Sequence, residues 1–182
     1  MSIFDKLKNA AKEAVSGSEK ETFVFQALPE SVEELKALPE AALDTPFKAA
    51  ALTVCALCAY AAEPQIGIDM LNFLRGPRPL STTDIQFLRD RFADGQTYVP
   101  FSYFAGAKPE NDYTPSEPFT VTVFADSYTY QNEGYAKLNI ASGGADSPRQ
   151  VTLRKKGDGT WCLWEQFLTV GIRKPKSQDP WA

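Results

Sequence analysis

The sequence predicts an α+β fold in which N-terminal helices pack on a C-terminal antiparallel sheet of about four to five strands. Apolar residues recur at helical spacings over residues 31–95, whereas they alternate with polar residues from 119 onward. Helices and strands that are segregated along a chain are typical of the α+β class. The chain of 182 residues is long enough for one well-buried core. We therefore expect a single domain over residues 21–182, with an appended amphipathic helix and linker over residues 1–20.

The N-terminal segment is predicted to be an amphipathic helix over residues 2–15, because apolar side chains recur there three and four residues apart. Residues 16–22, SGSEKET, are predicted to be a polar linker. Residues 22–28, TFVFQAL, are predicted to form a short strand with Phe23 and Phe25 on one face.

Capping residues mark the next two helix starts. Ser31 is followed three residues later by Glu34, which is the signature of a capping box. Thr45 precedes Pro46, and proline is favoured at the first helical position, where its missing N–H is not needed. The helix that follows, residues 46–62, is apolar on nearly every face, so it is predicted to be the buried central helix.

The central helix contains a C-x-x-C pair, Cys55 and Cys58. In redox proteins of the thioredoxin type, the reactive cysteine lies at a helix N-terminus, which stabilises the thiolate. Cys55 lies more than two turns inside its helix among apolar neighbours, and Cys162 alone cannot complete a four-cysteine zinc site. Both cysteines are therefore predicted to pack in the core.

Two more helices complete the helical half. One is predicted over residues 66–75, and the other runs from a cap at Ser81 or Thr82 to Gly95. A loop rich in proline and aromatic residues follows over residues 98–118, and loops of this length are commonly functional or specially packed.

Strands with alternating apolar residues make up the second half. They are FTVTVFAD, GYAKLNIAS, RQVTLRKK and TWCLWEQFL, and the turns between them make them antiparallel. The last two form a hairpin whose three-residue loop places Gly159 in the left-handed region. This register puts Leu153 opposite Leu163 and Val151 opposite Glu165.

The composition excludes several classes of chemistry. The chain has no histidine, which removes Ser-His-Asp and Cys-His catalysis and every metal site that needs an imidazole. It also has no phosphate-binding glycine motif and no cluster of metal ligands, so we expect no cofactor and no metal. The formal net charge of −4 disfavours general nucleic-acid binding. The alternative is that the basic run 154–156, RKK, with Trp161 and Trp164 nearby, binds single-stranded nucleic acid through stacking and charge. The charge is uneven, however, because residues 149–176 hold seven Lys or Arg and two acids, whereas residues 109–136 hold five acids and no base.

Four segments resemble an uncharacterised family of small bacterial proteins, a domain of unknown function. These segments are NFLRGPRPLS, SYFAGAKPENDYTPSEP, SGGADSPR and GIRKPKSQDPWA. The resemblance covers about residues 27–182 and implies a bacterial origin and one domain. It implies no activity and no cofactor.

Nine side chains are candidates for a binding site. Most lie on loops, where a rigid scaffold presents recognition groups, and Trp and Arg often dominate binding energy. The candidates are Arg75, Tyr103, Asn111, Tyr113, Asp146, Arg149, Trp164, Glu165 and Trp181. We expect the loop residues among them to share one face. The alternative is that they lock the loops together, with Arg149 bound to carbonyls and Trp181 covering the core.

Two of these candidates have a more specific interpretation. The register predicts that Glu165 lies on an apolar face with Trp161 and Leu163, where it would either serve catalysis or form an ion pair with Arg149 or Arg173 near the sheet edge. The turn SGGADSPR could form a nest of backbone amides for an anion, with Arg149 beside it. The alternative is plain turn chemistry, which its Gly, Asp and Pro residues also support.

We expect a cytoplasmic, non-catalytic accessory domain that binds another protein, since no secretory signal or disulfide framework is visible. The first alternative is a small-molecule-binding or enzymatic pocket between sheet and helices, lined by Tyr103, Trp164 and Glu165. The second is peripheral membrane association through residues 2–15, and self-association also stays open. A deep closed pocket that reaches Glu165 would favour the first alternative, whereas a filled core with surface loops would favour protein binding.

Overall fold

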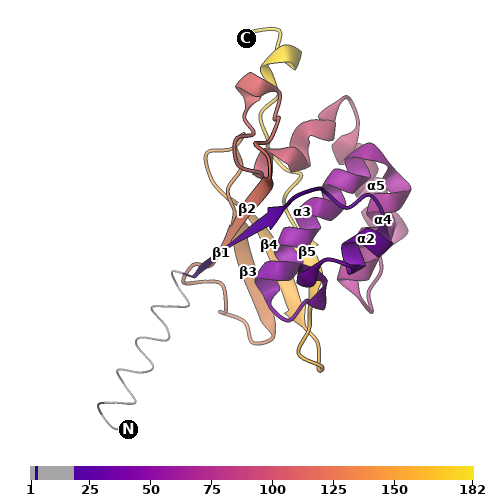
Figure 1. Ribbon diagram of the computed structural model, residues 1–182, viewed down its shortest axis with the longest axis vertical. Coiled ribbons are helices and arrows are strands. Elements are labelled where there is room, and N and C mark those ends of the chain that lie inside the picture. Colours follow the sequence, from indigo (N-terminus) through magenta and orange to yellow (C-terminus); the bar gives the residue numbers. More distant parts are fainter. Residues whose placement is uncertain (1–2, 4–18) are drawn as a thin grey trace.

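Five antiparallel strands form one sheet in the order β1-β2-β3-β4-β5, and the helices pack against one of its faces (Figure 1). The computed structural model describes residue 3 and residues 19–182. The strands are β1 (Lys20–Phe25), β2 (Phe119–Phe124), β3 (Tyr135–Ile140), β4 (Arg149–Lys155) and β5 (Trp161–Gln166). The α-helices are α2 (Val32–Lys36), α3 (Pro46–Ala62), α4 (Pro64–Arg75) and α5 (Thr82–Phe92). The predicted α+β class and strand number are confirmed.

The start of the sheet differs from the sequence prediction. Strand β1 begins at Lys20, which pairs with Phe124, so the last part of the predicted linker 16–22 belongs to the strand. Phe23 and Phe25 are both buried on the same face, as predicted. The predicted amphipathic helix over residues 2–15 lies outside the described residues, apart from residue 3.

Helix α3 is the buried centre of the fold, as its apolar sequence predicts. Thr45 caps it by accepting a hydrogen bond from the Lys48 N–H at 3.3 Å. Cys55 and Cys58 are buried, and burial raises the pKa of each thiol, which confirms them as packing residues rather than thiolates. The polar side chain of Thr53 is satisfied within the helix, because its hydroxyl donates to a backbone carbonyl one turn earlier at 2.8 Å.

Helix α4 packs unusually closely on α3. A Cβ atom at Gly67 would lie 2.3 Å from the Cα atom of Tyr60, so only glycine allows this approach. The helix starts at Pro64, two residues before the predicted start, because proline occupies its first position instead of merely ending α3. Ser81 caps α5 and forms a complete capping box with Asp84.

The loop predicted over residues 98–118 is more ordered than its composition suggests. It contains most of the 3₁₀ helix η2 (Gln96–Tyr103) and all of η3 (Pro109–Asn111). The rings of Tyr98 and Tyr113 stack inside it with centroids 5.3 Å apart. Two further 3₁₀ helices lie outside this loop, η1 (Pro39–Ala42) before α3 and η4 (Lys176–Gln178) near the C-terminal end (Figure 1).

The predicted hairpin register is correct at one end and wrong at the other. Leu153 pairs with Leu163, as predicted, but Val151 pairs with Gln166 instead of Glu165. Thr152 pairs with Glu165 and Leu153 pairs with Leu163, so Trp164 of β5 has no partner in β4 and forms a β-bulge. A bulge reverses which side chains face the core from that point on, and alternation alone does not reveal it.

No helix among the described residues has both the length and the apolar character that crossing a membrane requires.

Candidate functional site

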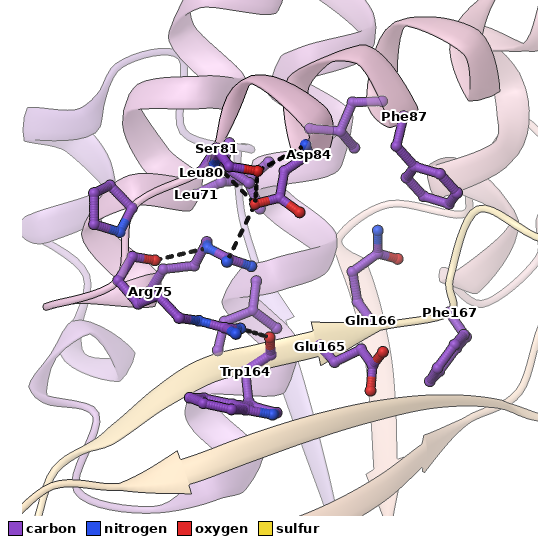
Figure 2. Close-up of a pocket in the computed structure, with 14 residues that line it drawn as sticks. Leu71, Arg75, Leu80, Ser81, Asp84, Phe87, Trp164, Glu165, Gln166 and Phe167 are labelled. Carbon is purple, nitrogen blue, oxygen red and sulfur yellow. Dashed lines mark hydrogen bonds and ion pairs between the residues drawn. The ribbon is translucent and has the colours of Figure 1, made fainter.

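A cleft of about 610 Å³ lies between strand β5 and the helices α4 and α5 (Figure 2). Its apolar walls are formed by Leu71, Phe87, Leu88, Leu163 and Phe167. We call this space the apolar chamber. Because it is half open, a ligand in it would stay in contact with solvent.

A second space of about 510 Å³ adjoins the first and shares several of its lining residues. We call it the cationic chamber, and the two together the β5 cleft. Its cationic side chains are Arg75, Arg78, Arg154, Lys155 and Lys156. None of the described residues that line this chamber is Asp or Glu. A protein of net charge −4 therefore concentrates positive charge at one place, which favours an anionic ligand.

The turn after α4 lies close to strand β5. Gly76 ends the helix with φ of 61°, a left-handed value that favours glycine. A Cβ atom there would lie 2.8 Å from the Sγ atom of Cys162 in β5. Glycine therefore lets the chain pass close to the edge strand and brings Arg78 over it.

Arg78 and Trp164 form the contact at which the two chambers meet. The Arg78 guanidinium lies 3.7 Å from the centroid of the Trp164 ring, and its Nη2 donates to the Trp164 carbonyl oxygen. The guanidinium of Arg154 lies 4.8 Å from the same ring, and the ring of Tyr135 meets it edge-on at 5.7 Å. Two cations therefore face one indole, an arrangement in which cation–π attraction orients the guanidinium groups.

Arg75 is the most buried cation of the cleft. Its Nε donates to the Arg78 carbonyl oxygen at 2.9 Å, and its Nη2 lies 3.5 Å from Oδ2 of Asp84 (Figure 2). Burial and the positive charge of Arg78 lower the pKa of Arg75. The Asp84 carboxylate also accepts hydrogen bonds from the N–H and hydroxyl of Ser81, so it is engaged at the α5 cap.

Three of the predicted site residues line the cleft, namely Arg75, Trp164 and Glu165. Tyr103 does not, because it is buried and donates from its hydroxyl to the Leu168 carbonyl oxygen at 2.5 Å. The predicted pocket lined by Tyr103 is therefore wrong in that residue. The predicted burial of Glu165 is also wrong, since the bulge at Trp164 leaves this carboxylate exposed at the cleft rim.

The other predicted residues lie at the far end of the sheet, in its loops or, for Arg149, at the start of β4, and most of them tie loops together (Figure 1). The side-chain amide of Asn111 donates to the Gly106 carbonyl oxygen at 2.8 Å. The Tyr113 hydroxyl donates to the Arg173 carbonyl oxygen at 2.5 Å. The same Arg173 pairs with Asp146 at 3.0 Å. Arg75 is not part of this group but lines the cleft, so the loop candidates do not all share one face.

Arg149 and Trp181 show whether these residues are recognition groups or lock the loops together. Arg149 donates to the carbonyl oxygens of Val170 and Gly171 at 2.7 and 2.9 Å, as the locking alternative predicts. It therefore forms no ion pair with Glu165. Trp181 does not cover the core, because its side chain is 94% exposed.

The predicted anion nest in SGGADSPR is wrong. The N–H groups of Gly143 and Gly144 donate to the Ser102 carbonyl oxygen at 2.8 Å and to the Ser142 hydroxyl at 3.1 Å. A Cβ atom at Gly143 would lie 1.9 Å from the Ala107 carbonyl oxygen. These amides hold the turn against the preceding loop and are engaged within the protein.

Sequence reasoning missed Arg78 as a site residue. The basic run Arg154 to Lys156 near Trp161 and Trp164 is the sequence signal for this cationic surface, but it gives no information on Arg78. Arg78 and Trp164 are 86 residues apart in the sequence, so no local sequence pattern indicates that the arginine lies over the indole ring.

No candidate metal site is found within residues 19–182, because no group of three or more Cys, Asp or Glu side chains is placed so that it could hold a metal ion.

Fold and cleft together define an α+β domain with an open cleft that combines cations with an aromatic ring. The chain belongs to the family described as Domain of unknown function (DUF6935), whose model matches residues 27–176. The matched range includes both walls of the β5 cleft but excludes β1 and Trp181. Comparison with curated proteins and with solved structures gives no match.

Proposed function

We propose that this chain is a non-catalytic binding domain whose β5 cleft takes up an acidic segment of a partner protein. The observation that carries the proposal is the cationic chamber, whose described lining residues include Trp164 and five Arg and Lys side chains but no carboxylate. Arginine and tryptophan are the side chains that most often dominate binding energy. Positive charge gathered in a groove also accelerates the encounter with an acidic partner.

The shape of the cleft favours a segment of a protein over a small molecule. The two chambers adjoin each other beside β5, which is the edge strand of the sheet, and the apolar chamber is half open. Small-molecule sites typically bury about 70–90% of the ligand surface. An extended chain can place an apolar side chain in the apolar chamber and acidic side chains in the cationic chamber at the same time.

A small amphipathic anion is the second candidate ligand. The observation in its favour is that each chamber has a volume within the range of about 300–1,000 Å³ that is usual for ligand pockets. Such a ligand would use the same two chambers, with its charged group against Arg154 and Lys155.

We propose the cytoplasm of a bacterium as the place of action. All three cysteines are free and buried, which fits a compartment that keeps thiols reduced. The bacterial origin rests on the resemblance of the loop segments.

Binding of a defined probe tests the proposal. The probe is a fluorescein-labelled peptide of glutamates around one phenylalanine, and its matched control carries lysines in place of the glutamates. Fluorescence anisotropy should show saturable binding of the acidic peptide only, and salt should weaken it because the attraction is electrostatic.

Charge reversal then locates the site. Replacing Arg154, Lys155 and Lys156 with Glu should abolish binding of the acidic peptide, whereas Lys108→Glu, which lies outside both chambers, should leave it unchanged. Equal binding by all variants would contradict the proposed site. An anionic small molecule that copurifies with the wild type, is released by denaturation and is absent from the triple variant would favour the second candidate instead.

A further inference from the structure

The loop between β2 and β3, residues 125–134, exposes two tyrosines next to acidic side chains. Tyr128 is 65% exposed and Tyr130 is 44% exposed. Glu133 is exposed on the same loop, and the half-buried Asp126 is its second residue. We call residues 125–134 the tyrosine loop. An exposed aromatic pair on the same loop as the exposed carboxylate of Glu133 has the chemistry of a protein-binding surface.

Hydrogen bonds hold this loop in a fixed shape. The Tyr128 N–H donates to Oδ1 of Asp126 at 2.8 Å, and the Asp126 N–H donates to the hydroxyl of Thr129 at 2.9 Å. Thr129 is buried, and its carbonyl oxygen accepts from the Lys137 N–H at 2.9 Å. The tyrosines are therefore presented in an ordered loop, which reduces the entropy lost on binding.

The tyrosine loop lies directly beside the cationic chamber. The Lys155 N–H donates to the Gly134 carbonyl oxygen at 2.8 Å, so the end of the loop contacts a chamber residue. Tyr135, the next residue, lies edge-on to Trp164. None of the residues that line either chamber comes from the loop itself, so the loop does not occupy its own cleft.

We infer that the β5 cleft of one copy binds the tyrosine loop of a second copy, and that the two copies form a twofold dimer. The inference rests on the proposed function, because it names the acidic segment that the cleft takes up. The cationic chamber and the acidic tyrosine loop are neighbouring patches of opposite charge, so the surface is complementary to itself. In a dimer with a twofold axis, each copy's cleft binds the other copy's loop, and both contacts form at once. In this dimer Glu133 meets Lys155 and Lys156 of the second copy, and the tyrosines meet Arg78 and Trp164.

A charge swap tests the inference on the whole chain. Analytical ultracentrifugation over a concentration series at low salt should show a dimer for the wild type and dissociation at high salt. Glu133→Lys should weaken the dimer at least tenfold, and so should the double replacement Lys155→Glu with Lys156→Glu. A mixture of these two variants should recover a heterodimer, because each cleft again meets a loop of opposite charge.

Matched variants distinguish a contact at the tyrosine loop from a general effect of net charge or of unfolding. Glu117→Lys changes an acid at the opposite end of β2, so it should leave the dimer intact. Tyr128→Ser should weaken the dimer without altering the melting temperature, since the tyrosine is exposed. If either charge variant fails to fold, Tyr128→Ser together with the salt dependence decides the question.

The outcomes separate this inference from the proposed function. A wild type that stays monomeric, or variants whose mixture does not associate, would overturn the inference. If that monomer still binds the glutamate–phenylalanine peptide, the proposed function stands. If the dimer forms, the peptide should dissociate it by competing for the cleft, and a dimer that the peptide cannot dissociate would show that the cleft is not its interface.

Discussion

The guanidinium of Arg78 lies 3.7 Å from the centroid of the Trp164 ring and donates to the carbonyl oxygen of the same residue. One side chain therefore covers an aromatic face and binds a backbone group of an edge strand. Edge strands expose unpaired backbone groups that invite pairing with other chains, and an arginine placed over them protects this position. The same arginine is a charged group in the candidate cleft, so its replacement should affect ligand binding more than stability.

We expect Arg78→Ala to weaken binding of the acidic peptide by about ten- to a hundredfold, since hydrogen bonds to charged groups contribute about 1.5–3 kcal/mol. Arg78→Lys should give an intermediate affinity, because lysine keeps the charge but cannot stack on Trp164 as a planar group. Fluorescence anisotropy measures the affinity, and a thermal melt monitors the fold. Wild-type affinity in the alanine variant would show that Arg78 does not contact the ligand.

The buried cysteines give a second prediction. Cys55 and Cys58 should resist a thiol reagent in the folded protein and react after denaturation, because burial raises the pKa of each thiol and excludes the reagent. Replacing each with Ala should cost about 1 kcal/mol or more through lost packing. Mass spectrometry counts the labelled thiols. Rapid labelling under native conditions, or zinc bound in stoichiometric amount, would contradict their role in packing.

Gly143→Ala should destabilise the protein strongly. The added methyl group would lie 1.9 Å from the Ala107 carbonyl oxygen, so the turn would have to separate from the loop it contacts. Overpacking of this kind typically costs about 1–3 kcal/mol. The matched control is Gly157→Ala, because a Cβ atom there meets no other atom within 4 Å. Denaturant unfolding should give a lower midpoint for the first variant only, and equal midpoints would contradict the close contact.

The buried hydroxyl of Tyr113 should make the protein less stable at alkaline pH. Burial, together with the nearby Tyr98, raises its pKa from the usual 10 to about 12. Because the folded-state pKa is the higher one, this contribution to stability is complete below pH 10 and is lost as the pH rises toward 12. Tyr113→Phe should therefore show a shallower decline of the melting temperature across this range than the wild type. Parallel declines would show that another group is responsible.

The same variant has an effect at neutral pH. Its missing hydroxyl leaves the Arg173 carbonyl oxygen without this hydrogen bond, and we expect a loss of about 1 kcal/mol in the free energy of unfolding.

Removal of residues 1–18 tests whether the N-terminal segment is tethered to the domain or is part of its core. The truncated chain keeps Glu19, whose carbonyl oxygen accepts from the Ala125 N–H at 2.8 Å, and so keeps the first contact of β1. We expect the cooperative melt to be nearly unchanged. A large fall in melting temperature would assign the segment to the core. Binding to anionic vesicles that the truncation abolishes would support the membrane alternative.

Elements with local signals were predictable from the sequence. Thr45 and Pro46 defined the start of α3, and Ser81 defined the start of α5, because capping depends on residues within one turn. The hairpin turn and the Leu153–Leu163 pair followed from the same kind of local pattern. These signals determined the fold class as well, since they show which half of the chain is helical.

The site was predictable only in part. Trp164 was identified as a candidate, but its role depends on a bulge that inserts one residue into β5 and exposes Glu165. Arg75 was identified too, whereas Arg78 was not, because its stacking on Trp164 joins segments that are distant in sequence. The loop residues such as Arg149 were interpreted as recognition groups, yet backbone carbonyls satisfy their hydrogen bonds. Tertiary contacts decided each of these cases.

The close contact of Gly67 with Tyr60 has a consequence for the kinetics of binding. Because α4 lies directly on α3, the α4 wall of the cleft cannot move outward without separating two packed helices. This wall is therefore in place before a ligand arrives, and the ligand rather than α4 loses conformational freedom on association. The association rate should then be set by diffusion and charge, not by an opening step, while differences between ligands should appear in how slowly they leave.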